Sequence, residues 1–531
     1  MVAEPTRDNA IEVVGMVKEM LAGFISDRDF MDLLRLSQVT LHRSELKPAD
    51  VPELGELLAA EFPVGEPILN RELIRLLAYL DTSEIVPEAI AYIKSDLPIA
   101  ERLNIAMHLP YFKYDWKHDE RYALIKFFEE TQHVDSGSSV PLYVMNVTRD
   151  LCKNLPLEEA RIFVSEGEKW PNAALVSLYQ YPDKLEDSDI ATLMKLDAQI
   201  DRPEYAGEAY KRLRTGIVAM LSQDGTAGSM EYLREIWVRS PERRQAIALG
   251  LSQQPNDENW DYLIRSMPVL ETYAVTEVMN ALMKVPQATD DPYALREVIL
   301  HGLKMEENGQ ESTPAIRLLA YWTGEDFDTT GLASPMQPWQ EWFADEFPEE
   351  PAAELPTLDK PSPWNVTTLS EYFLSSDGRS GSHENGKLVY EKAQCASCHR
   401  MNGTGTAIGP DLTTVASRFT RKEVIESVLY PSHIVSDQYR SQKVLTLDGR
   451  VLRGIVTRSD DEVIVLRDDK LEEHTIAQQN VDEVQTSKKS LMPSGLLDEL
   501  SSAEIRDLMT YMGYLPAKRT DVATRNNKDS R

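Results

Sequence analysis

The stretch KLVYEKAQCASCHR, residues 387–400, decides how the C-terminal part of this chain folds, because it contains the motif Cys395-Ala396-Ser397-Cys398-His399. Two thiols at this spacing can add to the two vinyl groups on one edge of a porphyrin. The next residue then lies under the iron, where imidazole is a good axial ligand. The C-x-x-C-H spacing predicts one covalent haem c, attached through Cys395 and Cys398 and ligated by His399.

Two other chemistries use paired cysteines at this spacing. A thioredoxin-like redox pair needs a βαβ setting, which the neighbouring sequence does not predict. A zinc site needs a fourth ligand beyond two cysteines and a histidine, and the third cysteine, Cys152, is far away in the sequence. Chance occurrence of the motif is the remaining alternative.

The residues that flank the motif favour haem. Gly386 and Tyr390 precede it on a predicted short helix, and a glycine there allows a second helix to cross closely. A helix predicted for residues 501–515, capped by Ser501 or Ser502, is the expected partner. Pro410 follows the motif, and its carbonyl could accept a hydrogen bond from Nδ1 of His399 and so tune the iron. An ordinary Gly-Pro turn is the alternative interpretation.

The sixth iron ligand has several candidates. Met492 lies in the predicted loop SLMPSG, residues 490–495, and a thioether ligand there would stabilise ferrous iron. A loop methionine that only fills a gap is the alternative. His433 and His474 are rival ligands. Three other methionines are poor candidates, because they follow the motif too closely or lie on the apolar face of the last helix: Met401, Met509 and Met512.

Residues 383–515 resemble a class I cytochrome c, and more closely the haem-binding domain of large multidomain proteins of planctomycetes and verrucomicrobia. The resemblance implies axial ligation by His399 and Met492, a β-rich insert before the Met492 loop, and HEAT-like helical repeats upstream. Relatives often carry a leader and a further N-terminal β-propeller, and neither is evident in this sequence. The resemblance rests on these segments and residues: CASCH (395–399), GPDL (409–412), LYPS (429–432), Tyr439, DG (448–449) with Gly454, SLMP (490–493), and EIRDL (504–508) with Tyr511.

The rest of the chain is predicted to be mainly helical. Apolar residues recur at three- and four-residue spacing through residues 1–346, and the phrase IRLLAY occurs at 74–79 and again at 316–321. This pattern favours an α-solenoid, with an irregular helical domain as the alternative. A Pro/Ser-rich linker, residues 347–382, should separate this helical region from the small all-α cytochrome c domain at 383–515. A polar tail, residues 516–531, should follow that domain.

Residues from about 438 to 486 break the helical pattern. Three strand-like segments are separated by turns, one of them at Asp448-Gly449, and two further short strands could follow. About five short strands predict a small barrel or a curled sheet inside the haem domain.

Composition narrows the functions that remain. The chain has 531 residues and a formal charge of −31, which disfavours nucleic acid and anionic membranes. No apolar stretch is long enough to span a bilayer, and residues 1–10 do not form a leader. Because haem attachment to C-x-x-C-H takes place outside the bacterial cytoplasm in proteins resembling this family, we expect a periplasmic location in spite of the missing leader.

The predicted function is single-electron transfer by a c-type cytochrome. If His399 and Met492 both bind the iron, no site remains open for substrate. The partner would be a redox protein or an associated dehydrogenase domain, with the helical repeats as a docking surface. The alternative is a haem enzyme or sensor with open iron, peroxidase-like or gas-binding. Whether the chain is an enzyme stays open, with electron transfer favoured over catalysis.

Overall fold

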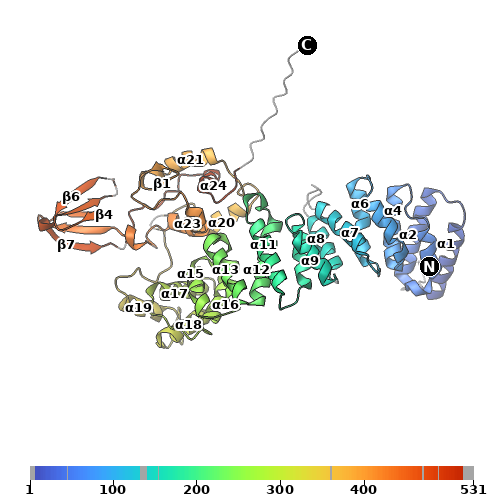
Figure 1. The fold of residues 1–531 in the computed structure, drawn as a ribbon, viewed down its shortest axis with the longest axis horizontal. Coiled ribbons are helices and arrows are strands. Elements are labelled where there is room, and N and C mark those ends of the chain that lie inside the picture. Colours follow the sequence, from blue (N-terminus) through green and yellow to red (C-terminus); the bar gives the residue numbers. More distant parts are fainter. Residues whose placement is uncertain are drawn as a thin grey trace, which may run out of the picture. The chain divides into compact units, whose positions relative to one another are not determined.

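The computed structural model describes residues 6–44, 46–131, 140–153, 155–358, 361–433, 435–468, 470, 472–487 and 489–517. The chain forms two compact units, residues 1–220 and 221–531. Helices predominate in both, and strands occur only near the C-terminal end of the described chain (Figure 1). No helix in this part of the chain is long and apolar enough to cross a membrane.

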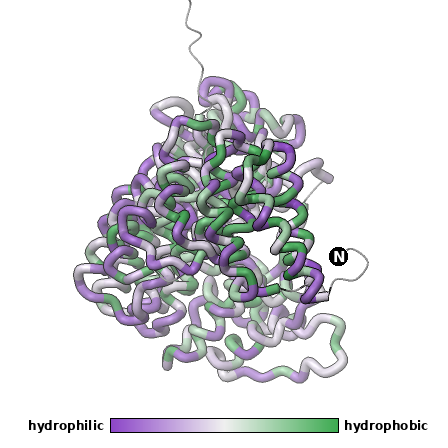
Figure 2. Tube along the Cα trace, turned by 90° about the vertical axis from the view of Figure 1, so that its right-hand side faces the viewer, coloured by the Kyte–Doolittle hydropathy of each residue, from purple (hydrophilic) through white to green (hydrophobic). Residues whose placement is uncertain are grey.

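The first unit consists of short amphipathic helices that contact close neighbours in the sequence, as α1 contacts α2 and α4 contacts α6. Hydrophobic and hydrophilic stretches alternate along the trace (Figure 2), as expected for helices that bury one face. The helices are α1 (Arg7–Leu21), α2 (Asp27–Ser44), α3 (Pro52–Ala59), α4 (Pro67–Leu80), α5 (Val86–Ile93), α6 (Ile99–Ala106), α7 (His118–Thr131), α8 (Val140–Cys152), α9 (Leu157–Ser165), α10 (Pro171–Ser177), α11 (Asp187–Gln199) and α12 (Glu208–Asp224).

The second unit begins with the end of α12 and seven further helices. The predicted helical character of residues 1–346 is confirmed, whereas the solenoid arrangement stays a prediction. These helices are α13 (Ala227–Arg239), α14 (Arg244–Leu251), α15 (Asp257–Ser266), α16 (Thr272–Leu282), α17 (Pro292–Glu307), α18 (Thr313–Thr323) and α19 (Gln337–Glu346).

The repeated phrase IRLLAY lies within α4 and again within α18, and its tyrosine makes the same kind of contact in both helices. In α4, the Tyr79 hydroxyl donates to the carbonyl oxygen of Leu46, 2.8 Å away. In α18, the Tyr321 hydroxyl donates to the carbonyl oxygen of Val285, 2.9 Å away. Each tyrosine thus fixes its helix to backbone more than thirty residues earlier in the chain. The sequence repeat corresponds to a repeated structural contact.

The segment predicted as a linker is only partly irregular. Residues 347–358 and 361–365 contain no helix or strand, in keeping with their prolines, but α20 (Val366–Leu374) lies inside the predicted linker. Leu369 and Phe373 of α20 are buried in the same core as the haem-motif helix. The predicted linker therefore contains a helix, and the domain boundary at 382/383 stays a prediction. Serines and glycines after α20 obscured a short helix whose two apolar residues complete the core.

The haem-motif region is built from five helices and one small hairpin. Its core includes Leu369, Tyr390, Ile425 and Met509. Figure 1 shows α21 and α24 beside each other, and these two helices are in extensive contact. The elements are α20, α21 (His383–Lys392), α22 (Cys395–Cys398), β1 (Arg400–Met401), β2 (Thr404–Gly405), α23 (Arg421–Leu429) and α24 (Ser502–Tyr511).

The predicted β-rich insert is present as a five-stranded antiparallel sheet. Its order is β6-β5-β4-β3-β7, so among the described residues the sheet is open, with β6 and β7 at its edges and without the closure of a barrel. The expected turn at Asp448-Gly449 joins β3 to β4, and Gly449 has a φ of 82°, which favours glycine. The strands are β3 (Gln442–Thr446), β4 (Val451–Ser459), β5 (Val463–Arg467), β6 (Glu473–Ala477) and β7 (Val481–Thr486).

Candidate haem-attachment site

The motif forms one tight helical turn. Gln394 precedes the turn with a φ of 61°, and the His399 N–H closes it by donating to the Cys395 carbonyl, 2.9 Å away. Both motif cysteines are partly buried, and all three cysteines of the chain are free. Burial raises the pKa of the Cys395 thiol to about 11. The turn therefore places two protonated, reduced thiols and an imidazole next to one another in sequence.

The imidazole of His399 is held by the loop that follows the motif. Its Nδ1 lies 2.9 Å from the Pro410 carbonyl oxygen, which is the contact expected from the sequence. Burial lowers the pKa of His399, so the ring is neutral and Nδ1 is the nitrogen that donates. This leaves Nε2 with a free lone pair, as an iron ligand requires.

Gly409 packs directly against this ring, a role that the sequence alone did not reveal. A Cβ at position 409 would lie 2.6 Å from Cε1 and 2.8 Å from Nδ1 of His399. Only glycine leaves room for the imidazole there. The sequence signal was the pair Gly409-Pro410, in which the glycine makes space for the ring and the proline supplies the carbonyl.

The loop of residues 402–412 is folded back onto the motif by backbone hydrogen bonds. The N–H groups of Ile408 and Gly409 donate to the Cys398 carbonyl at 3.1 and 2.8 Å, and Leu412 N–H donates to the Arg400 carbonyl at 2.8 Å. The β1–β2 hairpin turns at Asn402-Gly403, where both residues have positive φ. These bonds fix Pro410 relative to the motif.

Tyr390 is a second residue whose role only the structure reveals. It is 1% exposed, and its hydroxyl donates to the His399 carbonyl oxygen, 2.9 Å away. Burial raises the pKa of Tyr390, so it remains a neutral donor. The backbone of His399 is thus held from α21 while its side chain is held from the loop.

The predicted helix crossing is present. A Cβ at Gly386 of α21 would lie 2.0 Å from the Asp507 carbonyl oxygen of α24, so these backbones are in direct contact. Ser501 caps α24 as predicted, with its side chain accepting from the Glu504 N–H and the Glu504 carboxylate accepting from the Ser501 N–H. The crossing fixes the direction in which α21 enters the motif.

Met492 lies in a loop, outside the core that buries Met401, Met509 and Met512. Its side chain is partly exposed, whereas Met401, Met509 and Met512 are each at most 6% exposed and belong to the core. The Met492 N–H donates to the Ser490 hydroxyl, 3.1 Å away. The three core methionines pack in the interior, whereas ligation by Met492 stays a prediction.

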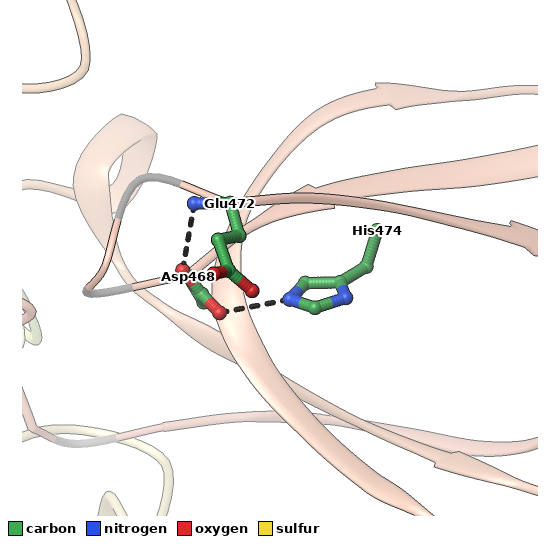
Figure 3. Close-up of side chains that lie close together, drawn as sticks. All are labelled: Asp468, Glu472 and His474. Carbon is green, nitrogen blue, oxygen red and sulfur yellow. Dashed lines mark hydrogen bonds and ion pairs between the residues drawn. The ribbon is translucent and has the colours of Figure 1, made fainter.

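The two rival histidines are engaged elsewhere. Nδ1 of His433 lies 3.4 Å from the Arg296 guanidinium, and burial lowers the pKa of His433 to about 4. Nε2 of His474 lies 2.8 Å from the Asp468 carboxylate, whose other oxygen accepts from the Glu472 N–H (Figure 3). His474 thus belongs to the end of the β5–β6 hairpin.

The residues present fit a covalent haem. Two free thiols can form thioether bonds, and a neutral imidazole with one anchored nitrogen is a suitable axial ligand. Among curated proteins, none matches this chain. Residues 383–439, which include Cys395, Cys398, His399 and Pro410, match the family model for cytochrome c, and this match supports a cytochrome c-like, haem-binding domain in this segment.

Proposed function

We propose that this protein is a c-type cytochrome that carries one haem c and transfers single electrons, with His399 and Met492 as axial ligands. The observation that carries the proposal is the hydrogen bond from His399 Nδ1 to the Pro410 carbonyl, directly beside two free thiols. When bound, haem c supplies a one-electron Fe(III)/Fe(II) couple.

Each residue has a distinct part in this proposal. Cys395 and Cys398 would hold the porphyrin through thioether bonds, and His399 would bind the iron. Pro410 fixes the imidazole and increases its basicity through the hydrogen bond. Met492 would supply a second protein ligand to the iron, and an iron held by both His399 and Met492 would favour electron transfer over substrate chemistry.

We further infer a redox partner, either a separate protein or an associated dehydrogenase. The charge of −31 favours a partner with a basic surface, because opposite potentials accelerate encounter. The helices of residues 7–346 would provide the docking surface as a degenerate α-solenoid. The equivalent contacts of Tyr79 and Tyr321 support such a repeat. The periplasm is the proposed location, because it is where such thioethers are formed.

Co-expression with a cytochrome c maturation system tests the proposal. The purified protein should be red, give the pyridine haemochrome spectrum of haem c, and have an intact mass one haem above the polypeptide. The double variant Cys395→Ser/Cys398→Ser should lose the covalent haem. Cys152→Ala is the matched control and should keep it, because Cys152 is a buried residue of α8. A colourless wild type with the bare polypeptide mass would refute the proposal.

The coordination state decides between electron transfer and the open-site alternative. A low-spin ferric spectrum with a thioether–iron charge-transfer band, together with a one-electron redox titration, is the expected result. A five-coordinate high-spin ferric iron that binds peroxide or a small gas would instead support a haem enzyme or sensor.

A further inference from the structure

Arg453, on β4, makes contacts unlike those of the other arginines of the sheet. Its Nη2 donates to the carbonyl oxygens of Lys489 and Ser490, 2.8 and 3.1 Å away. Three arginines near the same strands instead pair with carboxylates close in sequence, namely Arg450 with Asp448, Arg458 with Asp460 and Arg467 with Glu473. Within the described parts of the chain, Arg453 has no ion pair.

The position of Arg453 in the sheet gives no local reason for a cation. Its cross-strand partner in the β3–β4 register is Lys443, and like charges that face each other in a ladder are destabilising. In the described part of the sheet, the pairing places no carboxylate directly opposite either Arg453 or Lys443. The two backbone carbonyls of the 489–490 segment are therefore the interaction that explains an arginine here, since a planar guanidinium can bind both at once.

Ser441 reinforces the same segment. It is fully buried, and its hydroxyl donates to the Lys489 carbonyl oxygen at 2.8 Å and accepts from Nε of Arg453 at 3.3 Å. Its own carbonyl accepts from the Ser487 N–H at 2.7 Å. From the other direction, the Ser490 N–H donates to the hydroxyl of Ser432, just beyond α23. The backbone leading to Met492 is thus held from three separate parts of the chain.

We propose that Arg453 is a positioning residue for the iron ligand Met492, and that the β-sheet braces the ligand loop. The inference rests on the proposed function, because it requires Met492 to bind the iron. A thioether is a weak ligand whose bond persists only if ordering its loop costs little at the moment of binding. The clamp of Arg453 and Ser441 orders residues 489–490 in advance, and Met492 follows two residues later.

The test is performed on the complete holoprotein with Arg453→Met. In the ferric state this variant should have a weaker thioether–iron band and bind added imidazole about tenfold more tightly than wild type, because a looser loop competes less well. Arg458→Met is the matched control on the same strand, since it removes an exposed ion pair, and it should behave like wild type. Arg453→Lys should restore only part of the effect, because an ammonium lacks the planar fork.

A double-mutant comparison separates positioning from general destabilisation. In a Met492→Ala background, Arg453→Met should cause no further change in imidazole affinity, because the ligand that it positions is gone. An equal tenfold change in that background, or wild-type behaviour of Arg453→Met, would overturn the inference. If Arg453→Met does not fold, Ser441→Ala replaces it and should shift the affinity in the same direction by a smaller factor.

The outcomes also distinguish this inference from the proposed function. A wild type without covalent haem refutes the proposed function itself. A wild type with haem, in which Met492→Ala keeps the thioether–iron band, retains the cytochrome and overturns the role of Arg453 together with that of Met492.

Discussion

Gly409 packs against the imidazole of His399, so closely that a Cβ at position 409 would be 2.6 Å from the ring carbon Cε1. The same ring donates from Nδ1 to the Pro410 carbonyl. Adjacent residues therefore supply the space and the acceptor that define the orientation of the imidazole.

Gly409→Ala should displace the imidazole without preventing haem attachment, because both cysteines remain. A longer Nδ1 hydrogen bond makes the imidazole a weaker donor to ferric iron, so the reduction potential should rise by on the order of 50 mV, close to a tenfold change for a one-electron couple. Spectroelectrochemical titration measures the shift. Gly403→Ala is the control, since nothing lies within 4 Å of a Cβ there, although its positive φ will cost some stability. Equal potentials for Gly409→Ala and wild type would show that the ring orientation is fixed by other contacts.

Met492→Ala should remove the thioether–iron band and lower the potential by at least about 60 mV, because a thioether favours ferrous iron. Absorption and redox titration of the ferric protein check this. Met509→Leu is the matched control, because Met509 is a fully buried core residue that should affect stability alone. A band that survives in Met492→Ala would move the sixth ligand to another residue.

Gly386→Ala should destabilise the haem domain by about 3 kcal/mol or more. The new Cβ would meet the Asp507 carbonyl at 2.0 Å, and a backbone group cannot move aside as a flexible side chain can. Thermal unfolding of the holoprotein, followed at the haem absorbance, measures the loss. Gly228→Ala in α13 is the control and should be neutral or slightly stabilising, since its Cβ would enter open space. Similar unfolding temperatures for both variants would contradict the observed helix crossing.

Glu297 predicts a pH dependence of stability. It is 4% exposed, and burial raises its pKa from the ordinary 4.5 to about 7, only partly offset by Arg296, Lys304 and Lys422. The carboxylate of Glu297 lies 3.7 Å from the Arg296 guanidinium, too far for a hydrogen bond, and Glu426 adds a like charge. Because the folded-state pKa is the higher one, the stabilising contribution is complete below about pH 4.5.

That contribution should be lost as the pH rises through 7, by on the order of 3 kcal/mol. Glu297→Gln should flatten this part of the stability profile and exceed wild type at pH 8, as measured by denaturant unfolding between pH 5 and 8. The exposed Glu277 gives the control Glu277→Gln, which should follow the wild-type profile. Parallel profiles for Glu297→Gln and wild type would mean that this carboxyl ionises freely in the folded protein.

Features that depend on neighbouring residues could be predicted from the sequence. The turn at Asp448-Gly449, the cap at Ser501 and the strands after residue 438 are all present, because each depends on local dihedral preferences or spacing. The helix α20 could not be predicted. Only Leu369 and Phe373 of its residues are buried, and that pattern is too short to stand out from the surrounding serines and glycines.

The sequence by itself predicted covalent haem attachment. Two thiols and an imidazole can reach one porphyrin because they lie within the five consecutive residues 395–399. Tertiary structure alone decided what surrounds those groups. The Tyr390 hydroxyl donates a hydrogen bond to the His399 carbonyl, and the Arg453 guanidinium donates one to the Lys489 carbonyl in the loop before Met492. Such hydrogen bonds depend on how distant segments pack. Donor and acceptor come within about 3 Å of each other only after the core has fixed the positions of both segments.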